Sequence, residues 1–289
     1  MLMDITHHDV AADGTSAPAP LEVRHLVQQW KRIDELLAGL KKEDWSAQTA
    51  LPGWTVRDVV AHVAGTEHLL TGEPVPDIEL PASTREYIRN PIGELNEKFV
   101  QEARALAIED AFEDFREVVA ARTEQLAEMS AADFEAETDS PVGRVPYRHF
   151  MGVRLFDCWV HEDDIRQALG MQHHLGGDTG RFAVQEIVRA LPRIVGKKAG
   201  APDGSRVRFR VTGDAETDLS LATDVVVDGR AALTDVDDTS QPTVELVFDT
   251  STFVRSATGR IVAEPGDGVQ INGDEDLGGA ILASIAFTI

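Results

Sequence analysis

Two kinds of hydrophobic pattern divide the chain. In the first half, apolar residues recur at three- and four-residue steps, which is typical of amphipathic helices. The predicted helices cover residues 21–40, 55–70, 92–129 and 147–169, and the third of these is one continuous helix or two. Four long helices joined by irregular connections predict an antiparallel bundle, a fold that commonly builds metal sites from side chains on facing helices.

Capping and turn residues support these helix boundaries. Thr55, with Asp58 three residues later, predicts the N-cap of the second helix, and Gly170 predicts the residue that ends the last one. The Pro- and Gly-containing segment 140–146 is expected to be a loop.

The second half changes to a period of two after one more helix at 179–195. Alternating apolar and polar residues predict half-buried strands, and shorter helical patterns stand between and after them. The predicted strands are 207–211, 219–221, 244–248 and 269–271, with helices at 250–258 and 275–286. The fold class is therefore α+β with two domains, a four-helix bundle followed by a smaller α/β domain.

The predicted division has three parts. Residues 1–20 are rich in Ala, Asp, Ser, Thr and Pro without a sustained period, so we expect a disordered leader. The helical bundle is placed at 21–175 and the C-terminal α+β domain at 176–289.

Composition narrows the classes of function. The 289 residues carry 27 basic and 50 acidic side chains, a formal charge of −23, which disfavours binding to nucleic acid or to an anionic membrane. No apolar stretch approaches the roughly 18 to 20 residues of a membrane span, and a basic region followed by an apolar core is missing near Met1. A cytoplasmic protein is expected, and its single cysteine, Cys158, excludes an internal disulfide.

Candidate chemistry centres on a carboxylate and two imidazoles. Asp157 and His161 lie four residues apart on a predicted helix, so both side chains can face one ion, and His62 can supply a third ligand from another helix. Two nitrogen ligands and one oxygen would leave a fourth position open for water or a sulfur atom, as in catalytic zinc sites. An Asp and a His at this spacing also form ordinary surface hydrogen bonds, so the pair alone does not decide between the two.

Other polar side chains are expected to be solvent-exposed or to pack in the core, without a role in chemistry. The acidic run at 162–164 predicts a mostly solvated face because consecutive helical residues point in different directions. His68 has no spaced carboxylate partner on an evident helix face and is expected to be solvated. Cys158 points away from the direction of Asp157 and is expected to pack in the core.

Three segments resemble the mycothiol-dependent maleylpyruvate isomerase-like family, which belongs to the DinB-like metal-binding bundles. They are LPGWTVRDVVAHV at 51–63, WVHEDDIR at 159–166, and the pattern TGR at 258–260 with NGD at 272–274. The resemblance implies a DinB-like four-helix bundle followed by a sterol-carrier-like domain.

The resemblance also implies a ligand set. His62, Asp157 and His161 fall on the family's metal-binding positions, with Asp157 where glutamate is usual. Arg166 matches an arginine that follows the last histidine ligand, and Arg260 matches a Gly-Arg of the C-terminal domain, so both are candidate catalytic residues that could bind anionic groups.

The implied function is that of a metal-dependent isomerase or transferase. A divalent metal, with zinc expected, would bind the thiol of the cosubstrate mycothiol, and the thiolate would attack a small electrophilic substrate. Two alternatives stay open at this point. One is a non-catalytic binding module with a degenerate metal site, which Asp157 favours, and the other is a metal hydrolase that uses no thiol.

Overall fold

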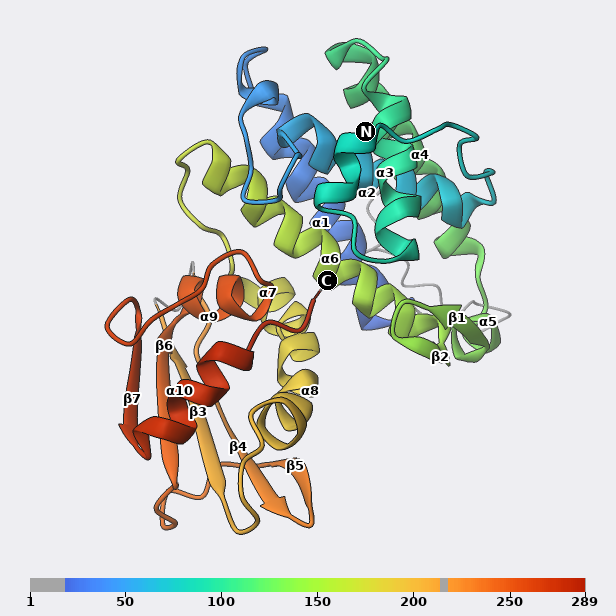
Figure 1. Cartoon of the computed structure of the whole chain (residues 1–289). Helices are drawn as coiled ribbons and strands as arrows, with labels where there is room; N and C mark the ends of the chain where they lie inside the picture. Colours follow the sequence, from blue (N-terminus) through green and yellow to red (C-terminus); the bar gives the residue numbers. More distant parts are fainter. Residues whose placement is uncertain (1–18, 214–217, 289) are drawn as a thin grey trace. The chain divides into compact units, whose positions relative to one another are not determined.

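The computed structural model describes residues 19–213 and 218–288, which form two compact units (Figure 1). The first unit ends at Gln172 and the second begins at His173. The predicted leader at 1–20 lies outside the described residues, except for its last two positions.

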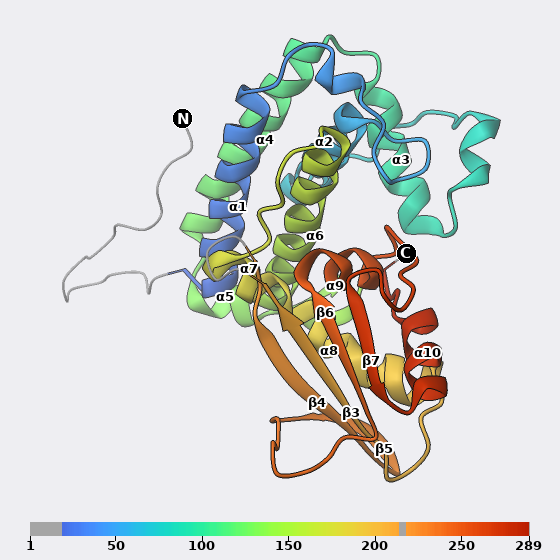
Figure 2. The same cartoon turned by 90° about the vertical axis from the view of Figure 1, so that its left-hand side faces the viewer.

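The first unit is helical with one small hairpin. Four long helices surround a shared core, since α1 contacts both α4 and α6, and α2 contacts the same two helices (Figure 2). The elements are α1 (Leu21–Ala38), η1 (Asp44–Ser46), α2 (Val56–Thr71), η2 (Ala82–Glu86), α3 (Pro91–Ala103), α4 (Ile108–Glu128), α5 (Ala131–Glu135), β1 (Glu137–Ser140), β2 (Gly143–Pro146) and α6 (Tyr147–Ala168).

The predicted helices of this unit are confirmed, whereas the predicted loop at 140–146 is wrong. The capping box is present, with the Thr55 backbone N–H donating to Asp58 Oδ2 at 2.8 Å, and Gly170 has a left-handed φ of 63°. The pattern at 92–129 resolves into two helices, α3 and α4. The expected loop at 140–146 is instead the turn and second strand of a two-stranded hairpin, whose four-residue strands are too short to reveal a period of two.

The second unit is a five-stranded sheet with helices packed against it. The strand order is β5-β4-β3-β6-β7, with β3 and β6 parallel and the other neighbours antiparallel. The elements are α7 (Gly177–Ala183), α8 (Gln185–Arg193), η3 (Ile194–Lys198), β3 (Arg206–Thr212), β4 (Leu221–Asp228), β5 (Arg230–Thr234), β6 (Val244–Asp249), α9 (Thr250–Ala257), β7 (Val269–Gly273) and α10 (Glu275–Ser284). The predicted α+β class is therefore confirmed.

Two details of this unit differ from the prediction. The helix expected at 179–195 is divided into α7 and α8, and it ends in a π-turn, η3. The strand expected at 219–221 begins only at Leu221 and extends to Asp228, where Gly229 with φ 63° turns the chain into β5, which was not predicted. Successive buried residues such as Val225 and the neighbouring Asp224 hide the alternation there.

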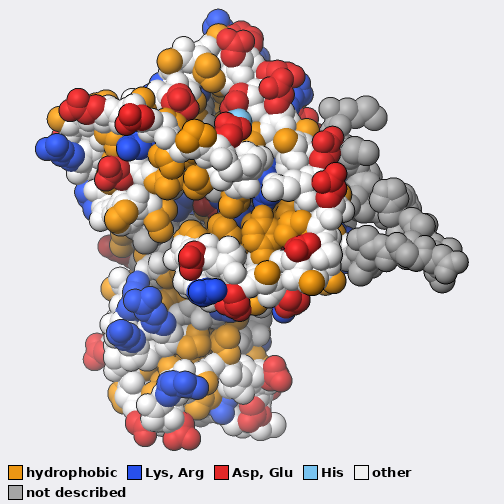
Figure 3. Space-filling view, turned by 90° about the vertical axis from the view of Figure 1, so that its right-hand side faces the viewer, with side chains coloured by type: hydrophobic (Ala, Val, Ile, Leu, Met, Phe, Trp, Pro, Cys, Tyr) orange, Lys and Arg blue, Asp and Glu red, His pale blue; other side chains and the backbone are white. Residues whose placement is uncertain are grey.

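The surface carries charges of both signs. On the face in Figure 3, acidic and basic side chains are scattered among hydrophobic ones. Within the described residues, none of the helices combines the length and apolar character that a membrane crossing requires.

A close approach of α2 and α3 depends on Gly65. A Cβ added at Gly65 would lie 2.4 Å from Cβ of Phe99, which is far inside van der Waals contact. We expect Gly65→Ala to lower the free energy of unfolding by about 1 to 3 kcal/mol, because the two helices must move apart. Urea unfolding measures the change. The control is Gly93→Ala in α3, where the new methyl would be 3.8 Å from its nearest neighbour; equal effects of the two substitutions would contradict this account.

His68 is not solvated as predicted, but links the last turn of α2 to α4. Its Nδ1 lies 2.7 Å from Glu73 Oε1 and its Nε2 lies 3.0 Å from Asp114 Oδ1. The hydrogen bond to Asp114 raises the pKa of His68 to about 9, against the effect of burial and with help from Glu73. The partner on α4 is 46 residues away in sequence, which is why no local pattern predicted it.

This ion pair predicts a pH-dependent contribution to stability. Because the folded pKa is raised above the ordinary 6.5, the contribution is complete below about pH 6.5 and is lost as the pH rises through about 9. His68→Gln is expected to cost about 1 kcal/mol at pH 6, since both carboxylates are well exposed, and almost nothing at about pH 10. Urea unfolding at the two pH values tests this, and a cost that grows with pH would contradict it.

Candidate metal centre

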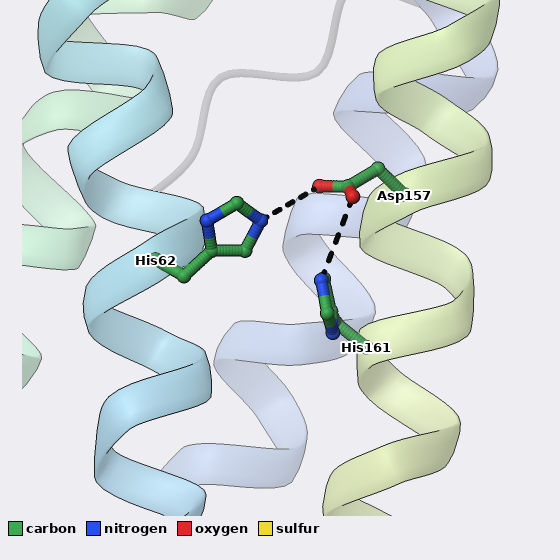
Figure 4. Close-up of side chains that lie close together, drawn as sticks. All are labelled: His62, Asp157 and His161. Carbon is green, nitrogen blue, oxygen red and sulfur yellow. Dashed lines mark hydrogen bonds and ion pairs between the residues drawn. The ribbon is translucent and has the colours of Figure 1, made fainter. Parts of the chain in front are cut away.

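Two helices bring the three predicted ligands together. His62 projects from α2, and Asp157 and His161 project from α6 (Figure 4). His62 Nε2 lies 3.3 Å from Asp157 Oδ2, and His161 Nε2 lies 3.5 Å from Asp157 Oδ1. One ligand atom from each residue lies within 4.8 Å of the other two. Among the described residues, this is the one group of three or more such side chains that could hold a metal ion.

The local sequence explains this convergence. Thr55 and Asp58 fix the start of α2, and His62 follows about two turns later on the side that packs against α6. Asp157 and His161 are one turn apart on α6 and therefore face the same direction. The Trp54 ring, which donates from Nε1 to Glu97, lies beside both imidazoles, with centroid separations of 5.3 Å to His62 and 6.5 Å to His161.

Burial and charge set the protonation of these groups. Both histidines are about 5% exposed, whereas the side chain of Asp157 is 31% exposed. Burial lowers the pKa of His62 and favours the neutral imidazole that binds metals. Burial alone would raise the pKa of Asp157, but His161, Arg154 and His62 outweigh it and hold that pKa well below its usual range.

Asp164 orients one of the imidazoles. His161 Nδ1 lies 3.0 Å from Asp164 Oδ2, and this carboxylate is almost fully buried. Burial would lower the pKa of His161, but Asp157 and Asp164 together raise it. A histidine that donates from Nδ1 to a carboxylate presents Nε2 to a metal, and such outer partners are usual at metal sites. The buried Nδ1 of His62 has no hydrogen-bond partner in the described part of the chain.

The donor set fits a divalent ion. Two imidazoles and one carboxylate match the ligands of catalytic zinc, which keep a further position open. The geometry therefore supports a site at the α2–α6 interface that could bind a metal and a fourth ligand.

The acidic run at 162–164 is not a solvated face, contrary to the prediction. Glu162, Asp163 and Asp164 are all at most 3% exposed, because α6 is the central helix of the unit and packs against α1, α2 and α5. Glu162 accepts from Gln29 of α1 and forms an ion pair with Arg32 of the same helix.

The two candidate catalytic arginines are not members of the ligand cluster. Arg166 donates from Nε to Glu162 Oε1 at 2.7 Å, so it belongs to the contacts that join α1 and α6. Arg260 lies in the second unit just after α9, where its Nη1 donates to the Thr258 carbonyl at 2.7 Å. The first unit therefore places the three predicted metal ligands together and gives Arg166 a carboxylate partner of its own.

Sequence reasoning missed an arginine that contacts the centre. Arg154 donates from Nη1 to Asp157 Oδ2 at 2.6 Å. A signal was present, since Arg154 lies three residues before Asp157 on the same helix. Cys158 packs in the core as predicted, and burial raises the pKa of its thiol to about 12.

Comparison with known proteins relates the helical unit to a known domain family. Residues 26–166 match the family model described as the mycothiol maleylpyruvate isomerase N-terminal domain. The helical unit of this chain is therefore similar to that domain family, and the resemblance inferred from the sequence is confirmed. The matched range contains all three candidate metal ligands and Arg166, but not Arg260.

Solved structures extend the likeness to both units. The crystal structure of a mycothiol-dependent maleylpyruvate isomerase is 19% identical, with a TM-score of 0.55 over 87% of this chain and 91% of that chain. A histidine-to-alanine mutant of such an isomerase is 18% identical, with the same TM-score and coverage. At these identities the likeness shows the fold alone. No curated protein sequence matches the chain.

Proposed function

We propose that the chain is a divalent-metal-dependent enzyme that uses mycothiol as a thiol cosubstrate and acts on a small electrophilic molecule. The observation that carries this proposal is the cluster of His62, Asp157 and His161 inside a domain similar to the mycothiol maleylpyruvate isomerase family. In this proposal the helical bundle, residues 21–175, holds the metal, and zinc is the expected ion because imidazole and carboxylate ligands suit it. The proposal includes a cytoplasmic location, where a low-molecular-weight thiol is kept reduced.

A metal bound there would supply Lewis-acid chemistry, lowering the pKa of a coordinated thiol so that the thiolate is present at neutral pH. The residues of the chain have separate tasks. His62, Asp157 and His161 bind the ion, Asp164 orients His161, and the Trp54 ring excludes water from one side of the imidazoles. Cys158 is not the nucleophile, because its thiol is buried and its pKa is raised to about 12.

The arginines have proposed roles of different kinds. Arg260 would bind an anionic group of the substrate or the thiol, whereas Arg166, which pairs with Glu162, would keep α6 in register with α1. Arg260→Gln is expected to raise KM for an anionic substrate more than it lowers kcat, since a lost contact that is equal in ground state and transition state affects KM. Steady-state kinetics test this, and a lowered kcat with unchanged KM would contradict it.

The test of the proposed function is a turnover assay with maleylpyruvate, the substrate named for the structural relatives. Zinc-loaded protein is assayed with mycothiol, without any thiol, and with a matched non-cognate thiol such as glutathione. Turnover that requires both zinc and mycothiol is expected, and isomerised product without a retained sulfur would separate an isomerase from a transferase. Metal-dependent hydrolysis without thiol would contradict the proposal and favour a metal hydrolase. A protein that binds no metal would also contradict it and would favour the non-catalytic binding module.

A further inference from the structure

A chain of four charged groups, three of them buried, ends at the metal centre. Arg122 of α4 donates from Nε to Glu67 Oε2 at 3.0 Å. The other oxygen of Glu67, which lies on α2, accepts from Nε and Nη2 of Arg154 at 3.0 and 2.8 Å. Arg154 of α6 then donates from Nη1 to Asp157 Oδ2 at 2.6 Å. The chain therefore joins three helices through alternating positive and negative groups.

The Arg154 guanidinium is held on both sides. Arg122 and Glu67 have no exposed side-chain area and Arg154 has 5%, so solvent does not compete for these contacts. The three bonds of Arg154 use at least three of the five N–H groups of its guanidinium. The planar shape of that group fixes the directions of the bonds. Asp157 is the most exposed member of the chain, so its carboxylate gains most from a rigid neighbour.

We propose that Arg154 is a positioning residue for the metal centre, an inference that rests on the proposed metal-dependent function. It holds Asp157 through Oδ2, the oxygen that also lies 3.3 Å from His62 Nε2, and so keeps Oδ1 facing His161 Nε2. Glu67 and Arg122 hold Arg154 in turn. An aspartate side chain has one torsion fewer than glutamate, and the contact with Arg154 restrains the remaining carboxylate rotation.

The direction in which the loss of Arg154 changes metal affinity distinguishes a positioning role from a purely electrostatic one. A cation beside the site repels a divalent ion, so charge alone predicts that removing Arg154 tightens metal binding. Glu67 accepts two hydrogen bonds from the same guanidinium and offsets part of that repulsion. Loss of a partner that orients a metal ligand typically weakens metal affinity by about 10- to 100-fold. We expect weakening of this size.

The experiment measures zinc affinity by competition with a chelator and the visible spectrum of the cobalt(II)-loaded protein. Arg154→Gln is expected to weaken zinc binding by about 10- to 100-fold. Arg154→Lys keeps the charge but cannot bridge Glu67 and Asp157 with a planar fork, so it is expected to weaken binding and to change the cobalt spectrum. Arg116→Gln, which removes a half-exposed arginine paired with Asp34, is the matched control and is expected to leave both readouts unchanged.

Glu67→Gln serves as an independent variant if the Arg154 variants do not fold. It keeps the contact between Arg154 and Asp157 but removes the charged group that holds the guanidinium, so a smaller loss of affinity and an altered cobalt spectrum are expected. Folded variants at Arg154 or Glu67 that bind zinc as tightly as the wild type, or more tightly, would overturn the inference while leaving the proposed function intact. A wild-type protein that binds no zinc would overturn the proposed function, and the positioning role with it.

Discussion

His161→Ala is expected to abolish stoichiometric metal binding. The substitution removes one of three ligands and also the contact through which Asp164 orients the site. Loss of a direct ligand should weaken zinc affinity by more than the roughly 100-fold that an outer partner contributes. Elemental analysis of dialysed wild-type and variant protein measures the metal content, and thiol-dependent turnover should be lost together with the metal.

The matched control is His149→Ala, a histidine on the same helix that is not in the cluster. It should retain metal at the wild-type ratio. If His161→Ala keeps its zinc, or if both variants lose it equally, the ion binds elsewhere or the variants have lost their fold. Thermal unfolding of the metal-free proteins separates these two explanations.

Arg122→Met is expected to cost about 3 to 5 kcal/mol of unfolding free energy in the metal-free protein. Arg122 is fully buried and donates to both Glu67 and the Tyr147 hydroxyl, so its removal leaves the buried Glu67 carboxylate with Arg154 as its remaining ion-pair partner. Urea unfolding measures the change. The control is Arg116→Met, a half-exposed ion pair worth at most about 1 kcal/mol.

The comparison between the two arginines tests how the bundle is held together. A similar small effect at Arg122 and Arg116 would show that the buried chain of charges adds little to stability. In that case the row of charged groups would serve the metal centre and not the stability of the bundle. The Arg154 variants should then still weaken zinc binding.

The sequence predicted most of the helical unit because periodicity is a local signal. Asp157 and His161 could be paired from their spacing, since a helix brings positions four apart to one face. The convergence of His62 on the same point could not come from periodicity, because the packing of α2 on α6 is a long-range contact. The family resemblance supplied that part of the prediction.

The buried charges were misjudged for the same physical reason. The run at 162–164 was predicted to be solvated because consecutive helical residues point in different directions, yet Glu162 binds Gln29, which is 133 residues away. Glu67 and Arg154 are separated by 87 residues. On a central helix such as α6, which has neighbours on several sides, polar residues are paired across the fold and the amphipathic pattern no longer reports exposure.

The most direct test of the central claim is the visible and near-ultraviolet spectrum of the cobalt(II)-loaded protein during titration with mycothiol. One equivalent of cobalt is expected to bind, and mycothiol is expected to produce a sulfur-to-cobalt charge-transfer band that is absent from His161→Ala. Cobalt binding without that band, or a band that persists in His161→Ala, would contradict the claim that His62, Asp157 and His161 hold a metal that binds the thiol.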